Sequence, residues 1–286
     1  MKTFFTCIIF VFFTIMGLAQ TQGIKINGEM RRFTMYTPKS INTSKPVPLV
    51  LNFHGSGMTA LEQMFYTEMN ETAEKNGFIV VYPQGENQDW NVGFDMDYDN
   101  GTNDIAFITL LLEKIKKNHK IDTNAVFATG LSRGGFFVHR LNAELPDVFA
   151  AIATVGAPLP NEVKKRHLSQ NKIAILLAHG DADKIVKYDG ELFAYQSFQE
   201  TVEYYRKFNN SNIEPITVRI NPIKDDTSIS IKKYSGYRPI ASITIKNGGH
   251  TWPGADDFNI GFPLGKTTHD IYFNDLLWDF FNANRK

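Results

Sequence analysis

The amino-acid sequence predicts an α/β fold: a mostly parallel, doubly wound sheet with helices on both faces and an antiparallel hairpin at its N-terminal side. Three observations support this prediction. Short, continuously apolar runs recur along the chain, longer amphipathic stretches lie between them, and an Asn-Gly pair precedes the first run. Continuous apolar runs are typical of strands that are covered on both faces. Their alternation with helices favours parallel pairing.

The predicted elements follow one another in a regular order. Residues 24–33 contain Asn27-Gly28, which suits a two-residue type I′ turn, and they therefore predict a hairpin. The predicted strands of the main sheet are 47–53, 78–82, 125–128, 150–155, 173–178 and 241–246. The predicted helices are 105–117, 134–145, 192–208 and 270–281. Asn103 or Asp104 is placed to cap the first helix. The polar stretches are predicted to be loops, at 160–171 and 209–227.

The first nineteen residues are predicted to be a signal peptide, and residues 20–286 a single domain. Lys2 supplies a positive start, residues 4–16 form an apolar run, and small residues precede a cleavage point after Ala19. A membrane anchor would need a longer apolar span. The one cysteine, Cys7, lies in this segment, so the mature chain is expected to be exported, to periplasm or medium, without disulfides.

The charge balance bears on possible partners. Lys plus Arg and Asp plus Glu both number 30, so no overall field favours nucleic acid or an anionic membrane. Apolar residues make up 43% of the chain, enough to bury a substantial core. We therefore expect neither a nucleic-acid nor a membrane partner, and a neutral ester, lipid or sugar fits best as a ligand.

The segment 130–134, Gly-Leu-Ser-Arg-Gly, predicts a nucleophile. It lies between a predicted strand and a predicted helix. At such a turn the serine adopts a strained backbone, which requires small residues two positions before and after it. Gly130 and Gly134 meet this requirement. The plain alternative is a serine in an ordinary turn, but the strand–turn–helix context favours Ser132 as a nucleophile.

A serine nucleophile needs a base and an acid, expected in the chain order serine, acid, histidine. His250 follows a predicted strand and lies in a loop rich in glycine and proline, where catalytic side chains are commonly carried. The remaining histidines after Ser132 lie in a helix, a polar stretch, a strand end with no room for a preceding acid, and a helix start: His139, His167, His179 and His269. His250 is therefore the predicted base.

The acid is predicted in the segment after strand 173–178. Asp181 and Asp183 both lie there, and periodicity does not separate them. The one that is not the acid is expected to be a turn residue. An oxyanion hole also requires backbone N–H groups. We expect these from Arg133 and from the glycine-containing loop after strand 47–53, at Ser56 and Gly57.

Several segments in order resemble one family. They are His54-Gly55, 82–85, Trp90-Asn91, 103–107, 130–135, 179–183 and 249–254. Together they resemble the polyhydroxybutyrate-depolymerase-like esterases, which include feruloyl and acetylxylan esterases of the first carbohydrate esterase family. The resemblance covers nearly the whole mature chain and implies the α/β-hydrolase fold. It also implies that Asp183, through the pattern His-Gly-x-x-Asp, is the acid, and it supports His250 as the base.

The resemblance also directs attention to substrate contacts. Trp252, two residues beyond the predicted base, Trp90 and His54 are the candidate substrate-binding residues, and Phe136 is a weaker one; packing is the alternative role. Many relatives have disulfides near the Trp-Asn segment, and the mature chain has no cysteine. The acidic stretch 93–100 departs from relatives that are rich in Cys or Gly there. Because no linker or binding domain follows Lys286, a soluble or carbohydrate-linked ester is favoured over a crystalline polymer.

These features predict a secreted serine esterase acting on plant cell-wall polysaccharide by two-step acyl transfer. No cofactor or metal is expected, since no histidines have metal-ligand spacing and no G-x-G-x-x-G follows a strand. The alternatives are an esterase of polyhydroxyalkanoate oligomers, a peptidase or acyltransferase with the same fold, and a non-catalytic binding protein.

Overall fold

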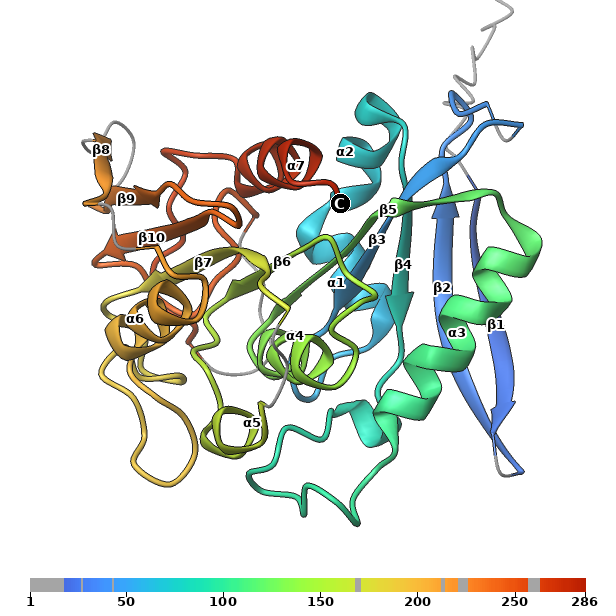
Figure 1. The fold of residues 1–286 in the computed structure, drawn as a ribbon, viewed down its shortest axis with the longest axis horizontal. Coiled ribbons are helices and arrows are strands. Elements are labelled where there is room, and N and C mark those ends of the chain that lie inside the picture. The colour runs from blue at the N-terminus through green and yellow to red at the C-terminus, as the bar shows by residue number, and fades with distance from the viewer. Residues whose placement is uncertain are drawn as a thin grey trace, which may run out of the picture.

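The computed structural model describes residues 18–26, 28–42, 44–167, 171–211, 214–220, 226–256 and 263–286. Within these ranges the strands form one sheet in the order β1-β2-β4-β3-β5-β6-β7-β10-β9-β8 (Figure 1). The strands are β1 (Leu18–Ile26), β2 (Glu29–Thr37), β3 (Val47–Phe53), β4 (Ile79–Pro83), β5 (Ile121–Leu131), β6 (Ala151–Val155), β7 (Ala174–Gly180), β8 (Ile216–Ile220), β9 (Ser228–Tyr234) and β10 (Ile240–Lys246). The helices are α1 (Ala60–Thr67), α2 (Met69–Asn76), the short 3₁₀ helix η1 (Glu86–Gln88), α3 (Asp104–Asn118), α4 (Arg133–Glu144), α5 (Asn161–Arg166), α6 (Phe198–Phe208) and α7 (Phe273–Ala283).

The N-terminal hairpin is confirmed and is longer than predicted. Strands β1 and β2 pair antiparallel, and Ile26 faces Glu29 across a turn in which Gly28 has a φ of 94°. Such a φ is what a type I′ turn requires of its second residue. Strand β1 begins at Leu18, so its first two residues, Leu18 and Ala19, precede the predicted cleavage point after Ala19. The rest of the predicted signal peptide, residues 1–17, lies outside the described residues.

The middle of the sheet is parallel, as predicted. Strands β4, β3, β5, β6, β7 and β10 run parallel, whereas β2, β9 and β8 pair antiparallel with their neighbours. Each predicted strand of the main sheet is present within three residues at its start and end, except that β5 is longer. The second antiparallel edge, β9 and β8, was not predicted because β8 is largely exposed, and its apolar residues alternate with polar ones and form no continuous apolar run.

Some predicted boundaries are wrong. The 160–171 stretch contains α5, which buries only Val163 and therefore shows no apolar periodicity. The 209–227 stretch contains β8. Helix α6 begins at Phe198 and not at residue 192, because Ser197 and Glu200 form a reciprocal capping box. Helix α7 begins at Phe273, three residues later than predicted. Asn103, not Asp104, caps α3, since its side chain accepts the Ala106 N–H.

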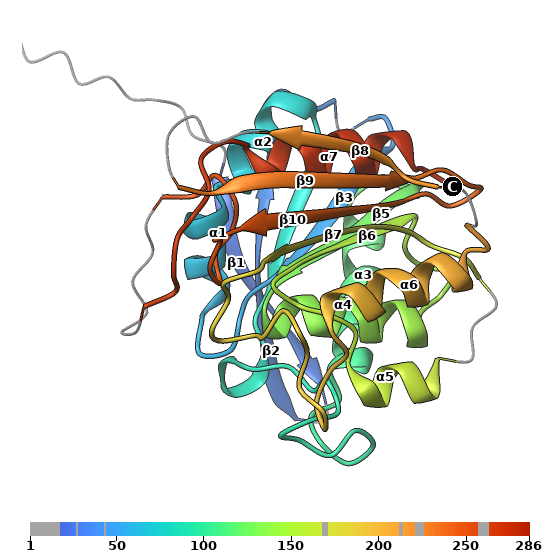
Figure 2. The same ribbon diagram turned by 90° about the vertical axis from the view of Figure 1, so that its left-hand side faces the viewer.

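Helices cover both faces of the sheet, which gives the fold two apolar cores. Helices α3, α4 and α6 pack on one face, and α1, α2 and α7 pack on the other (Figure 2). The first core is filled by residues such as Phe107 and Phe137, and the second by residues such as Trp278 and Phe281. Because both faces are covered, the central strands are almost wholly buried, which explains their continuous apolar sequence.

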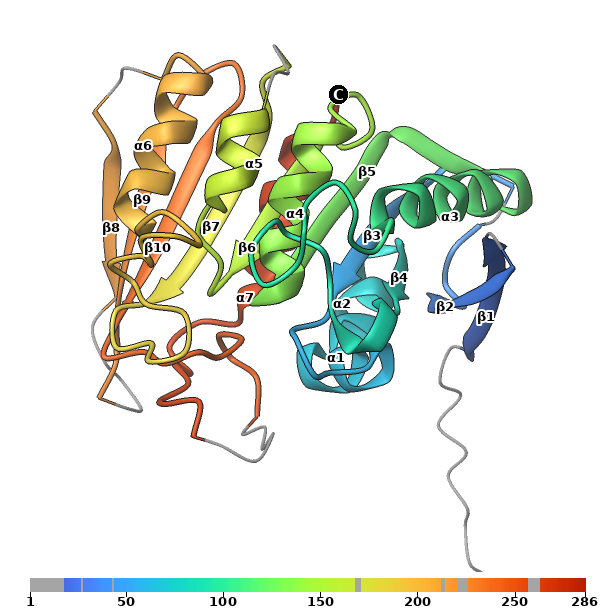
Figure 3. The same cartoon turned by 90° about the horizontal axis from the view of Figure 1, so that it is seen from below.

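The loops that follow the parallel strands meet at one edge of the sheet. The segments after β4 and β7 and the segment before α5 lie along the lower edge in Figure 1 and face the viewer in Figure 3. In doubly wound sheets, ligands bind at the carboxyl ends of the strands. No helix in the described ranges is long and apolar enough to cross a membrane.

Candidate active site

Ser132 occupies the sharp turn between β5 and α4. Its φ of 53° and ψ of −124° are strained for a residue with a side chain, and its N–H donates to the Val155 carbonyl at 2.9 Å. The flanking glycines are sterically required. A Cβ on Gly130 would lie 2.6 Å from the Gly134 carbonyl carbon, and one on Gly134 would lie 2.3 Å from the Phe53 carbonyl oxygen. The predicted elbow is therefore present.

His250 and Asp183 form a close, buried pair. The Nδ1–H of His250 donates to Asp183 Oδ2 at 2.6 Å. The other carboxylate oxygen, Oδ1, accepts the N–H groups of Ile185 and Val186, each at 2.9 Å. Burial alone would raise the pKa of Asp183, but hydrogen bonds from His179 and His250 hold this pKa well below its usual range. The carboxylate is thus charged and aimed at the His250 ring.

The backbone at residues 155–156 brings this pair next to Ser132. Val155 accepts the Ser132 N–H, and the next residue, Gly156, lies against the imidazole. A Cβ on Gly156 would be 3.0 Å from both Cε1 and Nδ1 of His250. Gly55, in the loop after β3, approaches from another side, since its Cβ would be 3.4 Å from Ser132 Cβ. The three residues predicted as a triad come from three segments, the turn after β5 and the loops after β7 and β10, and the backbone of residues 155–156 contacts both Ser132 and His250.

The structure separates the two candidate acids. Asp181 is exposed, and its Oδ1 accepts the Asn247 N–H at 2.6 Å. Asp183 is buried and faces His250. Asp181 thus holds the start of the loop that carries His250, whereas Asp183 is the carboxylate that contacts the His250 ring.

The predicted oxyanion donors are placed unequally. Arg133 is the first residue of α4, where a backbone N–H has no partner within the helix and points out of its positive end. The prediction for Gly57 is wrong, because its N–H already donates to the Gln88 carbonyl at 2.8 Å. Of the loop after β3, Ser56 remains as the candidate.

The two tryptophans predicted to bind substrate are packing residues. Trp90 is 0% exposed; its indole N–H donates to the His54 carbonyl at 3.0 Å, and its ring stacks on Phe137 at 4.9 Å. Trp252 is 1% exposed, and its indole N–H donates to Asn274 at 3.0 Å. The prediction that these two rings contact the substrate is therefore wrong, and both rings pack in the protein interior.

His54 is also buried and not a substrate contact. Its Nδ1–H donates to the Gly55 carbonyl at 2.8 Å, and its Nε2 accepts the Gly85 N–H at 2.9 Å. Burial lowers the pKa of His54 to about 4, so the ring is neutral at neutral pH, as this pattern of one donor and one acceptor requires. The ring joins the loops after β3 and β4 behind the site.

His179 is a site residue that sequence reasoning missed. Its Nε2 lies 3.3 Å from Asp183 Oδ2 and 2.9 Å from the Val186 carbonyl oxygen. From the sequence, His179 was considered only as a candidate base, and His250 was preferred. His179 lies near the end of β7, and Asp183 follows four residues later in the loop after that strand. This short spacing was the available signal that His179 lies beside the acid.

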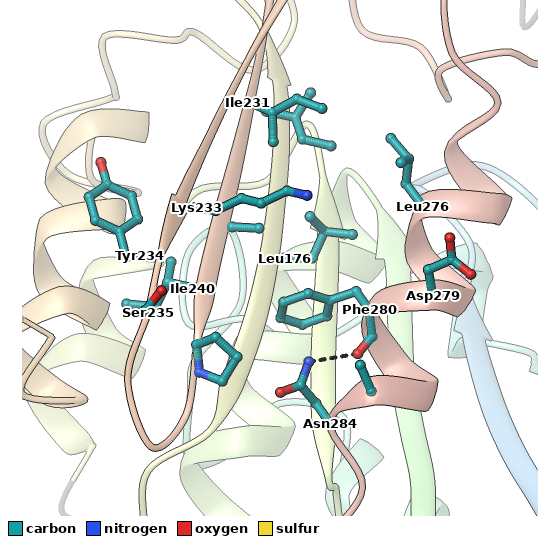
Figure 4. A pocket seen from close by; sticks show the side chains of 14 residues that line it. Leu176, Ile231, Lys233, Tyr234, Ser235, Ile240, Leu276, Asp279, Phe280 and Asn284 are labelled. Atoms are coloured by element: carbon teal, nitrogen blue, oxygen red, sulfur yellow. Dashed lines mark hydrogen bonds between the residues drawn. The ribbon is translucent and has the colours of Figure 1, made fainter. Parts of the chain in front are cut away.

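A separate apolar hollow of about 380 Å³ lies between β9, β10 and α7 (Figure 4). Ile231, Ile240, Leu276 and Phe280 are among its lining residues, with Lys233 and Asp279 also on its wall. None of the predicted site residues lines it. It is therefore a feature distinct from the Ser132 site.

Comparison with known proteins finds similar esterases. Residues 31–165 match the family described as esterase PHB depolymerase. Over 265 residues the chain is 25% identical to "Probable feruloyl esterase C" of Aspergillus oryzae, covering 91% of this chain and 86% of that protein. It is 28% identical over 163 residues to the bifunctional acetylxylan esterase/xylanase XynS20E of Neocallimastix patriciarum, covering 56% of this chain and 22% of that protein.

Solved structures show the same fold. The acetyl xylan esterase from Aspergillus awamori superposes with a TM-score of 0.67 at 17% identity, covering 92% of this chain and 99% of that one. The α/β-hydrolase fold expected from the sequence is thereby confirmed. The relatives identify the chain as an esterase, and its sequence is similar to proteins described as PHB depolymerase, feruloyl esterase and acetylxylan esterase.

Proposed function

We propose that this esterase is a secreted serine carboxylesterase with Ser132 as nucleophile, His250 as base and Asp183 as orienting acid. The observation that carries the proposal is the buried His250–Asp183 pair, 2.6 Å apart and placed through Gly156 beside the strained Ser132 turn. A nucleophile, a base and a group that orients the base are what hydroxyl activation requires.

Acylation follows from this arrangement. His250 Nε2 takes the Ser132 proton as Oγ attacks the ester carbonyl, and the backbone N–H groups of Arg133 and Ser56 receive the oxyanion. Asp183 stabilises the imidazolium, and its own position is fixed by two backbone N–H groups. When the tetrahedral intermediate collapses, His250 returns the proton to the leaving alcohol.

Deacylation repeats these steps with water. His250 takes a proton from a water molecule that attacks the acyl-enzyme, and the same backbone donors hold the second oxyanion. Collapse releases the carboxylic acid and returns the proton to Ser132. Removing a single oxyanion donor is expected to cost roughly 3 kcal/mol of transition-state stabilisation.

The proposed substrates are feruloyl or acetyl esters on plant cell-wall polysaccharide. The relatives named as a feruloyl esterase and an acetylxylan esterase/xylanase support this class. A second candidate, esters of hydroxyalkanoate oligomers, is supported by the matched family description. Export is proposed from the leader-like residues 1–19, with a positive start, an apolar run and small residues at the end.

The test is to incubate the purified protein with arabinoxylan that carries both ferulate and acetate, and to quantify both acids, with Ser132→Ala as control. Release of either acid by the wild type alone is expected. Turnover of only hydroxyalkanoate esters would replace the polysaccharide substrate with the second candidate. Equal turnover by Ser132→Ala would refute the serine mechanism.

A further inference from the structure

The side chain of Arg133 binds the loop that follows η1, at residues 89–95. Its Nε lies 3.1 Å from Asp89 Oδ1, and its Nη2 lies 2.9 Å from Asp95 Oδ2. Its Nη1 donates to the Phe94 carbonyl at 3.2 Å, and its Cζ lies 4.5 Å from the centroid of the Phe94 ring. The Arg133 side chain is only 12% exposed. One residue, adjacent to Ser132 in sequence, thus makes four contacts with this loop.

The loop bound by Arg133 has a strained backbone. Gly93 has a φ of 85°, and Asp95, which has a side chain, has a φ of 61°. Such a conformation persists when its surroundings hold it, and such residues cluster at ligand-binding sites. On the other side, Asn91 anchors the loop by donating its N–H to Asp104 at 2.9 Å. The segment between Asn91 and Asp95 is therefore fixed at both ends.

Phe94 is the accessible member of an aromatic cluster beside Ser132. Its ring meets Phe136 edge-on at 5.1 Å and Tyr195 at 5.8 Å. Phe136 and Tyr195 are buried, whereas Phe94 is only half-buried. Phe136 donates its N–H to the Ser132 carbonyl, so it lies one helical turn from Ser132 on the same side of α4. The cluster therefore flanks the start of the helix that carries the nucleophile.

We propose that Arg133 and the two aspartates hold Phe94 as a specificity wall that contacts the planar aromatic acyl group of a hydroxycinnamate ester. The inference rests on the proposed function, in which the ester's ring lies on its acyl side and the sugar on its alcohol side. An acetyl group has no ring to meet Phe94. Ring-to-ring contact therefore favours the aromatic acyl group, by roughly two- to tenfold in kcat/KM.

The experiment compares 4-nitrophenyl ferulate with 4-nitrophenyl acetate, which share a leaving group and differ only in the acyl group. Phe94→Ala, Phe94→Leu and Asp95→Asn are each expected to lower kcat/KM for the ferulate by roughly two- to tenfold and to leave the acetate value unchanged. Asp99→Asn is the matched control, because Asp99 is an exposed aspartate of the same loop that pairs with Arg166. It is expected to change neither value.

A double variant tests whether the Arg133–Asp95 ion pair acts through the Phe94 ring. Asp95→Asn in the Phe94→Ala background is expected to cause no further loss of kcat/KM for the ferulate, because the Arg133–Asp95 ion pair acts only by positioning the Phe94 ring. Equal losses on both esters, no loss on the ferulate, or acetate turnover by a wild type that leaves the ferulate uncleaved would overturn the inference. Acetate turnover that survives Ser132→Ala would instead refute the proposed function. Far-UV circular dichroism identifies any variant that fails to fold.

Discussion

The Nε2 atom of His179 lies 3.3 Å from the same Asp183 carboxylate oxygen that accepts the His250 Nδ1–H. Nε2 also lies 2.9 Å from the Val186 carbonyl oxygen, which can only accept, so it must carry a hydrogen. His179 Nδ1 is buried without a hydrogen-bond partner among the described residues. The acid thus accepts N–H groups from two histidines and from two backbone amides, and its orientation is fixed.

His179 is therefore expected to act as a positioning residue. Replacing it with Leu removes a donor to a charged group, and we expect kcat to fall roughly tenfold. With one hydrogen-bond donor fewer, less of the Asp183 negative charge is offset by His179 and more of it acts on His250. The acid limb of the kcat/KM profile is therefore expected to move to higher pH. Tyr195 faces Asp183, and Tyr188 packs against His179; both rings stay protonated through this range because burial raises the pKa of each.

The matched variant His179→Gln can keep a donor near the Nε2 position and is expected to recover most of the rate and the wild-type pH limb. Thermal unfolding is measured alongside the kinetics. If both variants lowered the melting temperature and left kcat and the pH limb unchanged, His179 would be a packing residue only.

Gly156 is expected to be intolerant of any side chain because it lies against the His250 ring. A Cβ there would be 3.0 Å from two ring atoms, and the φ of 59° disfavours a side chain in any case. Gly156→Ala should therefore displace His250 and lower kcat by at least tenfold, with a stability loss on the order of 1 kcal/mol. Kinetics and chemical denaturation measure the two effects.

Gly28→Ala provides the control for backbone strain. Gly28 has a φ of 94° and no atom within 4 Å of its hypothetical Cβ. It lies in the N-terminal turn, so its replacement should cost stability and leave kcat unchanged. An unchanged kcat in Gly156→Ala would show that the His250 ring is not held by this contact.

The structure explains why some of these features were predictable and others were not. Ser132 and its elbow follow from local chemistry, because a strained turn demands Gly130 and Gly134 wherever it occurs. The choice of Asp183 over Asp181 depends on which carboxylate is buried, and residues two apart in a turn look alike in sequence. The family pattern, not periodicity, separated them.

The prediction of which aromatic rings contact the substrate was the weakest one. Trp90 and Trp252 lie next to recognisable motifs, yet their indole N–H groups donate hydrogen bonds to buried protein groups. Phe94 was missed because its placement depends on Arg133, which lies 39 residues later in the chain. Such contacts are decided by tertiary packing, which adjacent sequence does not encode.

Buried histidines are expected to make the protein less stable in mild acid. Burial lowers the pKa of both His54 and His139 to about 4 in the folded chain, whereas an unfolded histidine titrates near 6.5. Between these values the unfolded state binds more protons. The stability is therefore complete above pH 6.5 and is lost as the pH falls toward 4, by on the order of 1 kcal/mol per pH unit for each histidine.

Chemical denaturation between pH 4 and pH 7.5 measures this dependence. His119 and His167, whose pKa values are also lowered by burial, contribute with the same sign. His139→Gln, which does not titrate, is expected to flatten the curve. A wild-type free energy of unfolding that stayed constant from pH 6.5 to pH 4 would contradict the neutral, buried state of these rings.

The central claim is that Ser132, activated by His250, is the nucleophile. The most direct measurement is labelling with a fluorophosphonate, followed by peptide mass spectrometry of the adduct. We expect one adduct per chain, on Ser132, with none in Ser132→Ala and greatly slowed labelling in His250→Asn. An adduct on another residue, or equal labelling of Ser132→Ala, would contradict the account.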